Sequence, residues 1–178
     1  MAYHNLLSKN DRALVAYLVS KGVGTSADVF AAKRSQNKSL PCTICWSEKG
    51  EEAGMYSGTY NLQVSIMVKT SSAEDAAAAA AAARLASEAR VAATFDCFQL
   101  AADLAGTNDS TGENIADQIT AAGRALAISD PTNNADMSDY CCLNVRLTGI
   151  EAGFEEEGDA WIDTFNLEIL ACPNGAAG

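Results

Sequence analysis

The sequence EEAGMYSGTYNLQV at residues 51–64 decides the fold, because it recurs in outline at residues 155–169 as EEEGDAWIDTFNLEI. Each copy has an acidic, glycine-containing turn that leads into a strand of alternating apolar and polar residues. An apolar run precedes each copy, at residues 41–46 and 141–147. The sequence therefore predicts two β-hairpins. Either a duplication or a chance convergence of turn and strand chemistry would explain the repeat.

The segment between the hairpins has helical character. Eight alanines at residues 76–83 follow the capping box Ser71-x-x-Glu74, and alanine has the highest intrinsic helix propensity. Farther along, Val91, Phe95 and Phe98 recur at helical spacing and should face the core. The predicted helices cover approximately residues 9–21, 25–33, 71–106 and 113–127.

These elements predict an α+β fold, with a mostly antiparallel four-stranded sheet of two β-hairpins and helices packed on one face. The strands are predicted at about 42–48, 60–69, 139–148 and 160–171, and the long connection would let the second and third pair in parallel. The third strand should bury Cys141, Leu143, Val145 and Leu147. We expect one domain over 1–178, comprising N-terminal helices (1–40), a first hairpin (41–70), a helical insert (71–128), a second hairpin (139–171) and a mobile tail (172–178).

The net charge of −11 is unevenly distributed along the chain. Residues 1–49 hold seven basic and three acidic side chains, whereas the remainder holds five basic and twenty acidic ones. We expect the two parts to form different surfaces, with Lys33, Arg34 and Lys38 facing a neighbouring subunit or ring. Tight binding of a DNA backbone is not expected, because it needs clustered cations.

The six cysteines do not indicate a metal site. Cys42 and Cys45 have zinc-like spacing, but side chains three apart in a strand point to opposite faces. The sequence contains one histidine, His4, near the N-terminus. We therefore predict buried, reduced thiols, no metal and no cofactor, as in a protein made in the cytosol.

No catalytic motif stands out. The sequence has neither a nucleophile elbow nor a phosphate-binding P-loop, and most acidic residues lie in turns, where carboxylates are usually solvated. We predict a structural or interaction protein and not an enzyme. An enzyme or cation site that uses the acidic turns is the alternative from another class.

The layout resembles the tail-terminator and tail-completion proteins of tailed bacteriophages. The resemblance covers roughly residues 8–171 and rests on order and pattern: short helices, the Pro-led strand at 40–45, the strand at 60–68 leading into a helix, and the closing segment 165–169. The eight-alanine run and the length of the insert depart from the family pattern.

The resemblance implies a virion protein, assembled in the host cytoplasm as a ring, typically of six subunits, at the head-proximal end of the tail. Such a ring caps the tail tube and joins it to the head connector, and DNA passes through it without specific binding. The alternatives are another connector component, such as a head-completion or stopper protein, and a monomeric cytosolic binding domain. If the hairpins are equivalent, both acidic turns should project to one side, at the channel or at the contact with the next ring; their residues are Glu51, Glu52, Glu155, Glu156 and Glu157.

Overall fold

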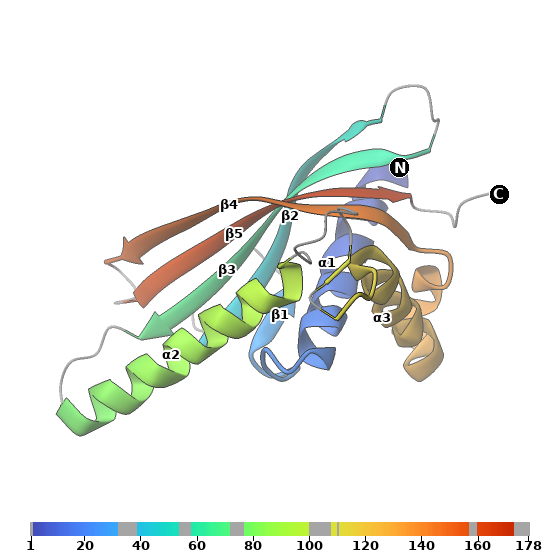
Figure 1. The fold of residues 1–178 in the computed structure, drawn as a ribbon. Coiled ribbons are helices and arrows are strands. Elements are labelled where there is room, and N and C mark those ends of the chain that lie inside the picture. Colours follow the sequence, from blue (N-terminus) through green and yellow to red (C-terminus); the bar gives the residue numbers. More distant parts are fainter. Residues whose placement is uncertain are drawn as a thin grey trace.

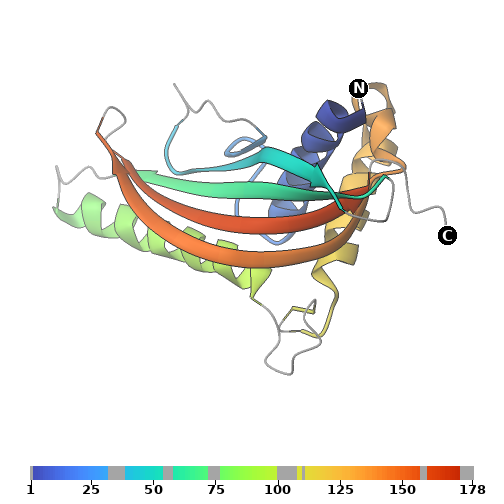
Figure 2. The same ribbon diagram turned by 90° about the horizontal axis from the view of Figure 1, so that it is seen from above.

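A computed structural model describes residues 2–31, 39–53, 58–71, 77–99, 108–109, 111–156 and 160–172. A strongly twisted sheet crosses the molecule, and helices pack against it (Figures 1 and 2). The helices are α1 Ala2–Ser20, α2 Ala77–Phe98, α3 Ile115–Ser129, α4 Pro131–Asn134 and the 3₁₀ helix η1 Ala135–Met137. The strands are β1 Val29–Ala31, β2 Cys42–Glu52, β3 Tyr60–Ser71, β4 Cys141–Glu155 and β5 Ala160–Cys172.

The sheet order is β1-β2-β3-β5-β4, and every neighbouring pair is antiparallel except β1 with β2. The two hairpins and the mostly antiparallel α+β architecture are therefore confirmed, but the sheet has five strands in place of four. The suggested parallel pairing of the second and third predicted strands is wrong, because β5 lies between β3 and β4.

The additional strand replaces part of a predicted helix. Residues 25–28 form a turn in which the Thr25 N–H donates to Asp28 Oδ1 at 2.7 Å, and the chain then extends as β1. Val29 and Phe30 are β-branched and aromatic residues that favour a strand, and they pair with Thr43 and Ile44 of β2. The predicted helix at 25–33 is thus wrong for residues 25–31, and residues 32–33 lie outside the described part.

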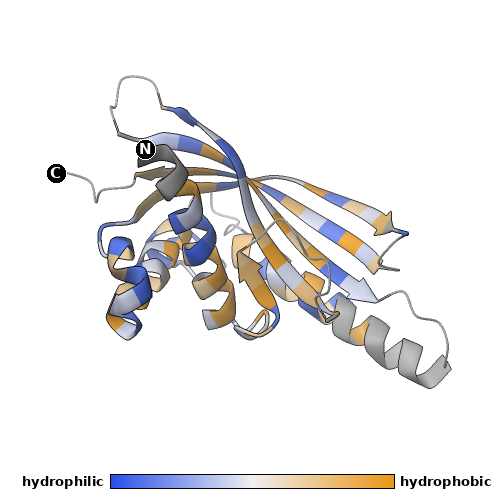
Figure 3. Cartoon of the chain, turned by 180° about the vertical axis from the view of Figure 1, so that it is seen from behind, coloured by the Kyte–Doolittle hydropathy of each residue, from blue (hydrophilic) through white to orange (hydrophobic). Residues whose placement is uncertain are grey.

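One face of the sheet carries the core. Leu62, Val64 and Ile66 of β3 lie opposite Ile169, Leu167 and Phe165 of β5, and all six are buried. Buried residues of α1, α2 and α3 complete the same cluster, including Leu14, Tyr17, Phe98 and Ile119. Hydrophobic and hydrophilic residues alternate along parts of the strands (Figure 3), as expected for strands with one face on the core.

Irregularities in β4 change the predicted inward set. A β-bulge between Cys142 and Asn144 shifts the alternation, so Cys142 and Val145 are buried whereas Leu143 is exposed. A second shift lies between Leu147 and Gly149. The strand also continues to Glu155, seven residues beyond its predicted end at 148.

The buried side of α2 differs from the predicted apolar stripe. Arg90, Thr94, Cys97 and Phe98 are buried, whereas Val91 and Phe95 are only half-buried. A charged residue can face inward here because the Arg90 guanidinium finds acceptors on Asp28, in the turn before β1, and on Thr43 of β2, as described below. The capping-box residue Glu74 lies outside the described residues.

Candidate interaction surfaces

The acidic residues of the two hairpins lie at opposite ends of the sheet. In the antiparallel pair of β3 and β5, Tyr60 is opposite Ala171 and Ser71 is opposite Ala160, so the start of β3 lies far from the start of β5 (Figure 1). The strand ends that carry these residues therefore lie apart, whereas residues 54–57 and 157–159 of the two turns lie outside the described part, so the predicted direction of the turns stays a prediction. A repeated hairpin does not fix the direction of its turn when the two copies pair in antiparallel fashion.

Most of the acidic residues predicted in the turns are the last residues of strands. Glu51 and Glu52 are the last residues of β2, and both are exposed; Lys49 Nζ lies 3.5 Å from Glu51 Oε1. Glu155 ends β4 and Glu156 follows it as an exposed turn residue. Glu157 lies outside the described residues, as do Lys33, Arg34 and Lys38, the predicted basic contact surface.

The cysteines are buried or half-buried free thiols. Cys45 lies opposite Ile66 on the core face, whereas Cys42, three positions earlier, lies opposite Lys69 on the other face. Burial raises the pKa of the Cys45 and Cys142 thiols, and it raises that of Cys97 to about 12. These thiols are therefore protonated at neutral pH and unreactive as nucleophiles.

A buried polar cluster joins α1 to β2 and to the start of β4. The Ser47 N–H and hydroxyl both donate to Asp11 Oδ1, at 2.7 and 2.6 Å. The Asn10 amide donates to Ser47 Oγ at 2.9 Å, and the Tyr140 hydroxyl donates to Asn10 Oδ1 at 2.7 Å. Burial raises the pKa of Asp11 to about 6, against the opposing effect of the bonds from Ser47.

The sequence analysis did not identify this cluster, although a signal exists. Asn10 lies four residues from both Leu6 and Leu14, which are fully buried, so its side chain falls on the apolar face of α1. A polar residue in such a position needs buried partners. Because these buried groups satisfy one another through hydrogen bonds, we assign the cluster a structural role.

Arg90 ties α2 to the edge of the sheet. Its Nε donates to Thr43 Oγ1 at 2.8 Å, and its Nη2 donates to Asp28 Oδ1 at 3.0 Å and to the Asp28 carbonyl at 3.1 Å. Hydrogen bonds from Arg90 hold the pKa of Asp28 below its usual value. The Arg90 side chain is 8% exposed and that of Asp28 is 34% exposed, so the ion pair is buried on the arginine side and partly open to solvent on the carboxylate side.

Asp109 organises the loop before α3. Its carboxylate accepts from the Thr111 N–H and hydroxyl, the Glu113 N–H and the Gln118 amide, and Lys21 Nζ lies 3.7 Å away. Burial would raise the pKa of Asp109, but these hydrogen bonds lower it well below the usual range. With both oxygens engaged, Asp109 is a loop-stabilising residue, although a cavity of about 220 Å³ adjoins it.

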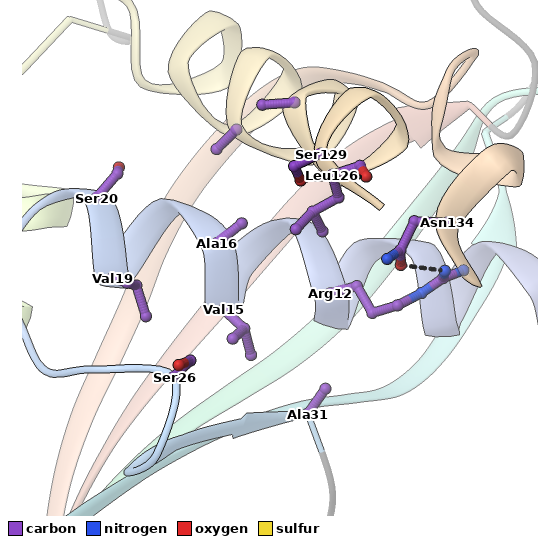
Figure 4. Close-up of a pocket in the computed structure, with 12 residues that line it drawn as sticks. Arg12, Val15, Ala16, Val19, Ser20, Ser26, Ala31, Leu126, Ser129 and Asn134 are labelled. Carbon is purple, nitrogen blue, oxygen red and sulfur yellow. Dashed lines mark hydrogen bonds between the residues drawn. The ribbon is translucent and has the colours of Figure 1, made fainter. Parts of the chain in front are cut away.

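An apolar groove of about 550 Å³ lies between α1, α3 and the β1 segment. Val15, Ala16 and Val19 of α1 form one wall, and Leu126 and Ser129 of α3 form another (Figure 4). Ala125 of α3 also lines the groove. Its lining side chains are mostly small. At one end, the Arg12 guanidinium donates to Asn134 Oδ1 at 3.0 Å and pairs with Asp136 at 2.6 Å. The groove has the volume of a typical binding pocket, but few convergent polar groups.

A second apolar surface lies at the far end of the β4–β5 hairpin. Phe154 and Trp161 are opposite each other in the register and pack edge to face with ring centroids 5.0 Å apart. They are 46% and 55% exposed, and Ile150 on the same strand is 47% exposed. Aromatic residues that remain this exposed are typical anchors for protein contacts.

A comparison with protein-family models finds no match, and a comparison with curated protein sequences finds no significant match. Among the described residues, no helix is both long enough and apolar enough to span a membrane.

Proposed function

We propose that this chain is a structural protein of a tailed-phage virion that forms a homo-oligomeric ring, typically of six subunits, at the head-proximal end of the tail. In this role it caps the tail tube and joins it to the head connector or stopper protein, while DNA passes through without specific binding. Assembly takes place in the host cytoplasm. The ring and its position rest on the resemblance of residues 8–171 to tail-terminator proteins.

The observation that carries the proposal is the exposed apolar surface on two separate parts of the molecule. The groove between α1 and α3 and the Phe154–Trp161 pair lie on different elements. A subunit within a ring needs two different contact surfaces, because a head-to-tail contact joins one patch to another. An enzyme would instead be expected to direct polar groups into its main cavity, and the groove is lined chiefly by alanine, valine, leucine and serine.

At most one of the two acidic pairs can line a given region of the ring channel. Because the two acidic hairpin ends lie at opposite ends of the sheet, Glu51 and Glu52 can face one region of a ring while Glu155 and Glu156 face another. Replacing each pair by Gln separately distinguishes them. The pair at the channel should increase retention of duplex DNA by the assembled ring, since its negative potential is removed, whereas a pair at a ring–ring contact should weaken joining instead.

The groove offers the most direct test of the ring. Ala125 and Ala121 are both exposed alanines of α3, one turn apart, but only Ala125 lines the groove. If the groove holds a neighbouring subunit, Ala125→Arg should reduce the assembled mass measured by light scattering, and Ala121→Arg should not. Equal behaviour of the two variants would contradict a subunit contact there. Replacing Lys33, Arg34 and Lys38 together by Glu tests the predicted basic contact in the same assay.

A different connector component would also form a ring, so mass alone does not separate it from a tail terminator. Addition of purified tail tubes does: a terminator should bind tube ends in electron micrographs, whereas a stopper or head-completion protein should bind the portal side. A monomeric cytosolic binding domain should bind neither and should not associate.

A further inference from the structure

The outer side of β4 is an open sheet edge over most of its length. β4 is the last strand in the sheet order, and among the described residues no strand pairs with its outer side. α3 closes only the beginning: the Cys142 N–H donates to Thr120 Oγ1 at 2.9 Å, and the Thr120 hydroxyl donates to the Cys142 carbonyl at 3.2 Å. The open part therefore runs from Leu143 to about Phe154. Open edges of this length are templates for another strand.

The backbone groups that face this edge follow from the register. The Val145 N–H donates to its neighbour Asn144 Oδ1 at 2.9 Å, so it points away from β5. Backbone groups alternate along an antiparallel strand, which turns those of Leu147 outward as well. Thr148 has no partner in β5, because Leu147 lies opposite Leu167 and Gly149 lies opposite the next residue, Asn166. The alternation of inward and outward backbone groups is therefore displaced by one residue after Thr148. Beyond it, the outward residues are Ile150 and Ala152.

Two glycines of β4 lie on its open part; Gly149 adjoins the irregularity at Thr148, where a glycine is common, whereas no bulge adjoins Gly153. A Cβ at Gly149 or Gly153 would meet no atom within 4 Å, and neither residue has a left-handed φ. Glycine within a strand costs about 0.5–1 kcal/mol relative to alanine. Strand glycines often mark a place where another backbone approaches closely. Both glycines lie within the open part of β4.

We propose that a second copy of this chain pairs through β4, antiparallel, about a two-fold axis between Thr148 and Gly149. This axis is the midpoint of the open segment, so the two open edges overlap completely. In this register Arg146 lies opposite Glu151 of the second copy, and the same pair forms again across the axis. Leu147 lies opposite Ile150 of the second copy, which covers a side chain that is 47% exposed in the single chain.

Two features favour this register: opposite charges meet across the contact, and residues on the core face of one sheet meet residues on the core face of the other. Arg146 and Glu151 are exposed, and the two side chains lie on the same face of the sheet, opposite Glu168 and Thr164 of β5. Among the described residues, no acid lies within 4.0 Å of Arg146. The shift at Thr148 places Val145, Leu147, Ile150 and Ala152 on the core face, so core-face residues meet core-face residues and the two sheets continue as one.

This contact does not rest on the proposed phage function. A two-fold contact cannot join neighbours within a ring whose two faces differ, because each subunit there meets the next head to tail. The β4 contact would therefore pair free chains or join subunits of two rings. Absence of the β4 contact would not contradict the proposed ring or its proposed function.

The experiment is a charge exchange read by analytical ultracentrifugation of the full chain over a dilution series. Over the dilution series, the parent should show a pairing step, from free chain to dimer or from one ring to two, that reverses on dilution. Arg146→Glu or Glu151→Arg alone should weaken it about 30-fold, because two attractive cross-strand pairs become two repulsive ones. An equimolar mixture of the two variants should restore it, because each mixed dimer contains two opposite-charge pairs. Lys49→Glu on β2 is the control and should change nothing.

A second variant tests backbone pairing. Ala152→Pro removes an N–H that faces the open edge and is not needed by β5, so the fold should survive, as circular dichroism would show, while the dimer is lost. A parent that stays monomeric to about 0.1 mM (a weak contact on the usual affinity scale), single reversals without effect, or a mixture that fails to re-form the dimer would overturn the proposal.

Discussion

The protonation of Asp11 offers a quantitative test of the core. Asp11 is 7% exposed, and burial raises its pKa from 3.8 to about 6. A carboxyl whose folded pKa is raised stabilises the fold below its unfolded pKa and loses that contribution as the pH rises through about 6. A shift of about two units corresponds to about 3 kcal/mol in total, of which about 2 kcal/mol should be lost between pH 4.5 and pH 7.5.

Asp11→Asn is the matching variant. Both bonds from Ser47 end on Oδ1, an oxygen that asparagine retains, and asparagine does not titrate. The free energy of unfolding of the parent should therefore fall by about 2 kcal/mol relative to that of Asp11→Asn between pH 4.5 and pH 7.5. Urea denaturation at several pH values measures this difference, in which the titration of all other groups cancels. Parallel stability curves for the two proteins would refute the reasoning.

Three other substitutions test the packing by denaturant unfolding. Arg90→Met removes the ion-pair partner of Asp28, which keeps its bond from the Thr25 N–H, and the donor to the Thr43 hydroxyl, and it should cost about 1–3 kcal/mol; a loss below about 0.5 kcal/mol, the usual effect of a surface change, would place Arg90 outside the core. Gly123→Ala should destabilise the fold by about 1–3 kcal/mol, although alanine has a better helix propensity than glycine. The new Cβ would lie 2.9 Å from Ala13 Cβ and 3.2 Å from Tyr140 Cδ1. A stabilised variant would show that α1 and α3 can separate freely. Tyr17→Phe removes the 2.7 Å bond to the Cys97 carbonyl and should cost about 1–2 kcal/mol, and an unchanged midpoint would mean that water replaces the hydroxyl.

The regular elements of this fold could be predicted from the sequence, since their signals are periodic. Leu62, Val64 and Ile66 alternate with polar neighbours, and the hairpins follow from that alternation and the turns between the strands. β1 could not be predicted, because three residues are too few to show a period and Thr25–Asp28 resembles a helix start. The bulges of β4 were equally invisible, as neither has a residue signature of its own.

The candidate surfaces could be predicted only in part. The acidic residues were found, but their positions at opposite ends of the sheet depend on the antiparallel pairing of β3 with β5, which no local pattern determines. The groove consists of small residues from α1 and α3 and depends on how those helices pack. Asn10 and Asp11 were missed because their partner Ser47 lies 36 or 37 residues away.

The mass of the purified, unmodified chain in solution, measured by native mass spectrometry and checked by electron microscopy, tests the central claim most directly. The account predicts a closed ring, typically of six copies, at concentrations where subunit contacts are saturated. A species that stops at two copies would support the β4 contact and contradict the ring. A chain that remains monomeric at every concentration, with the groove and the Phe154–Trp161 pair open to solvent, would contradict the account of this protein as an assembly subunit.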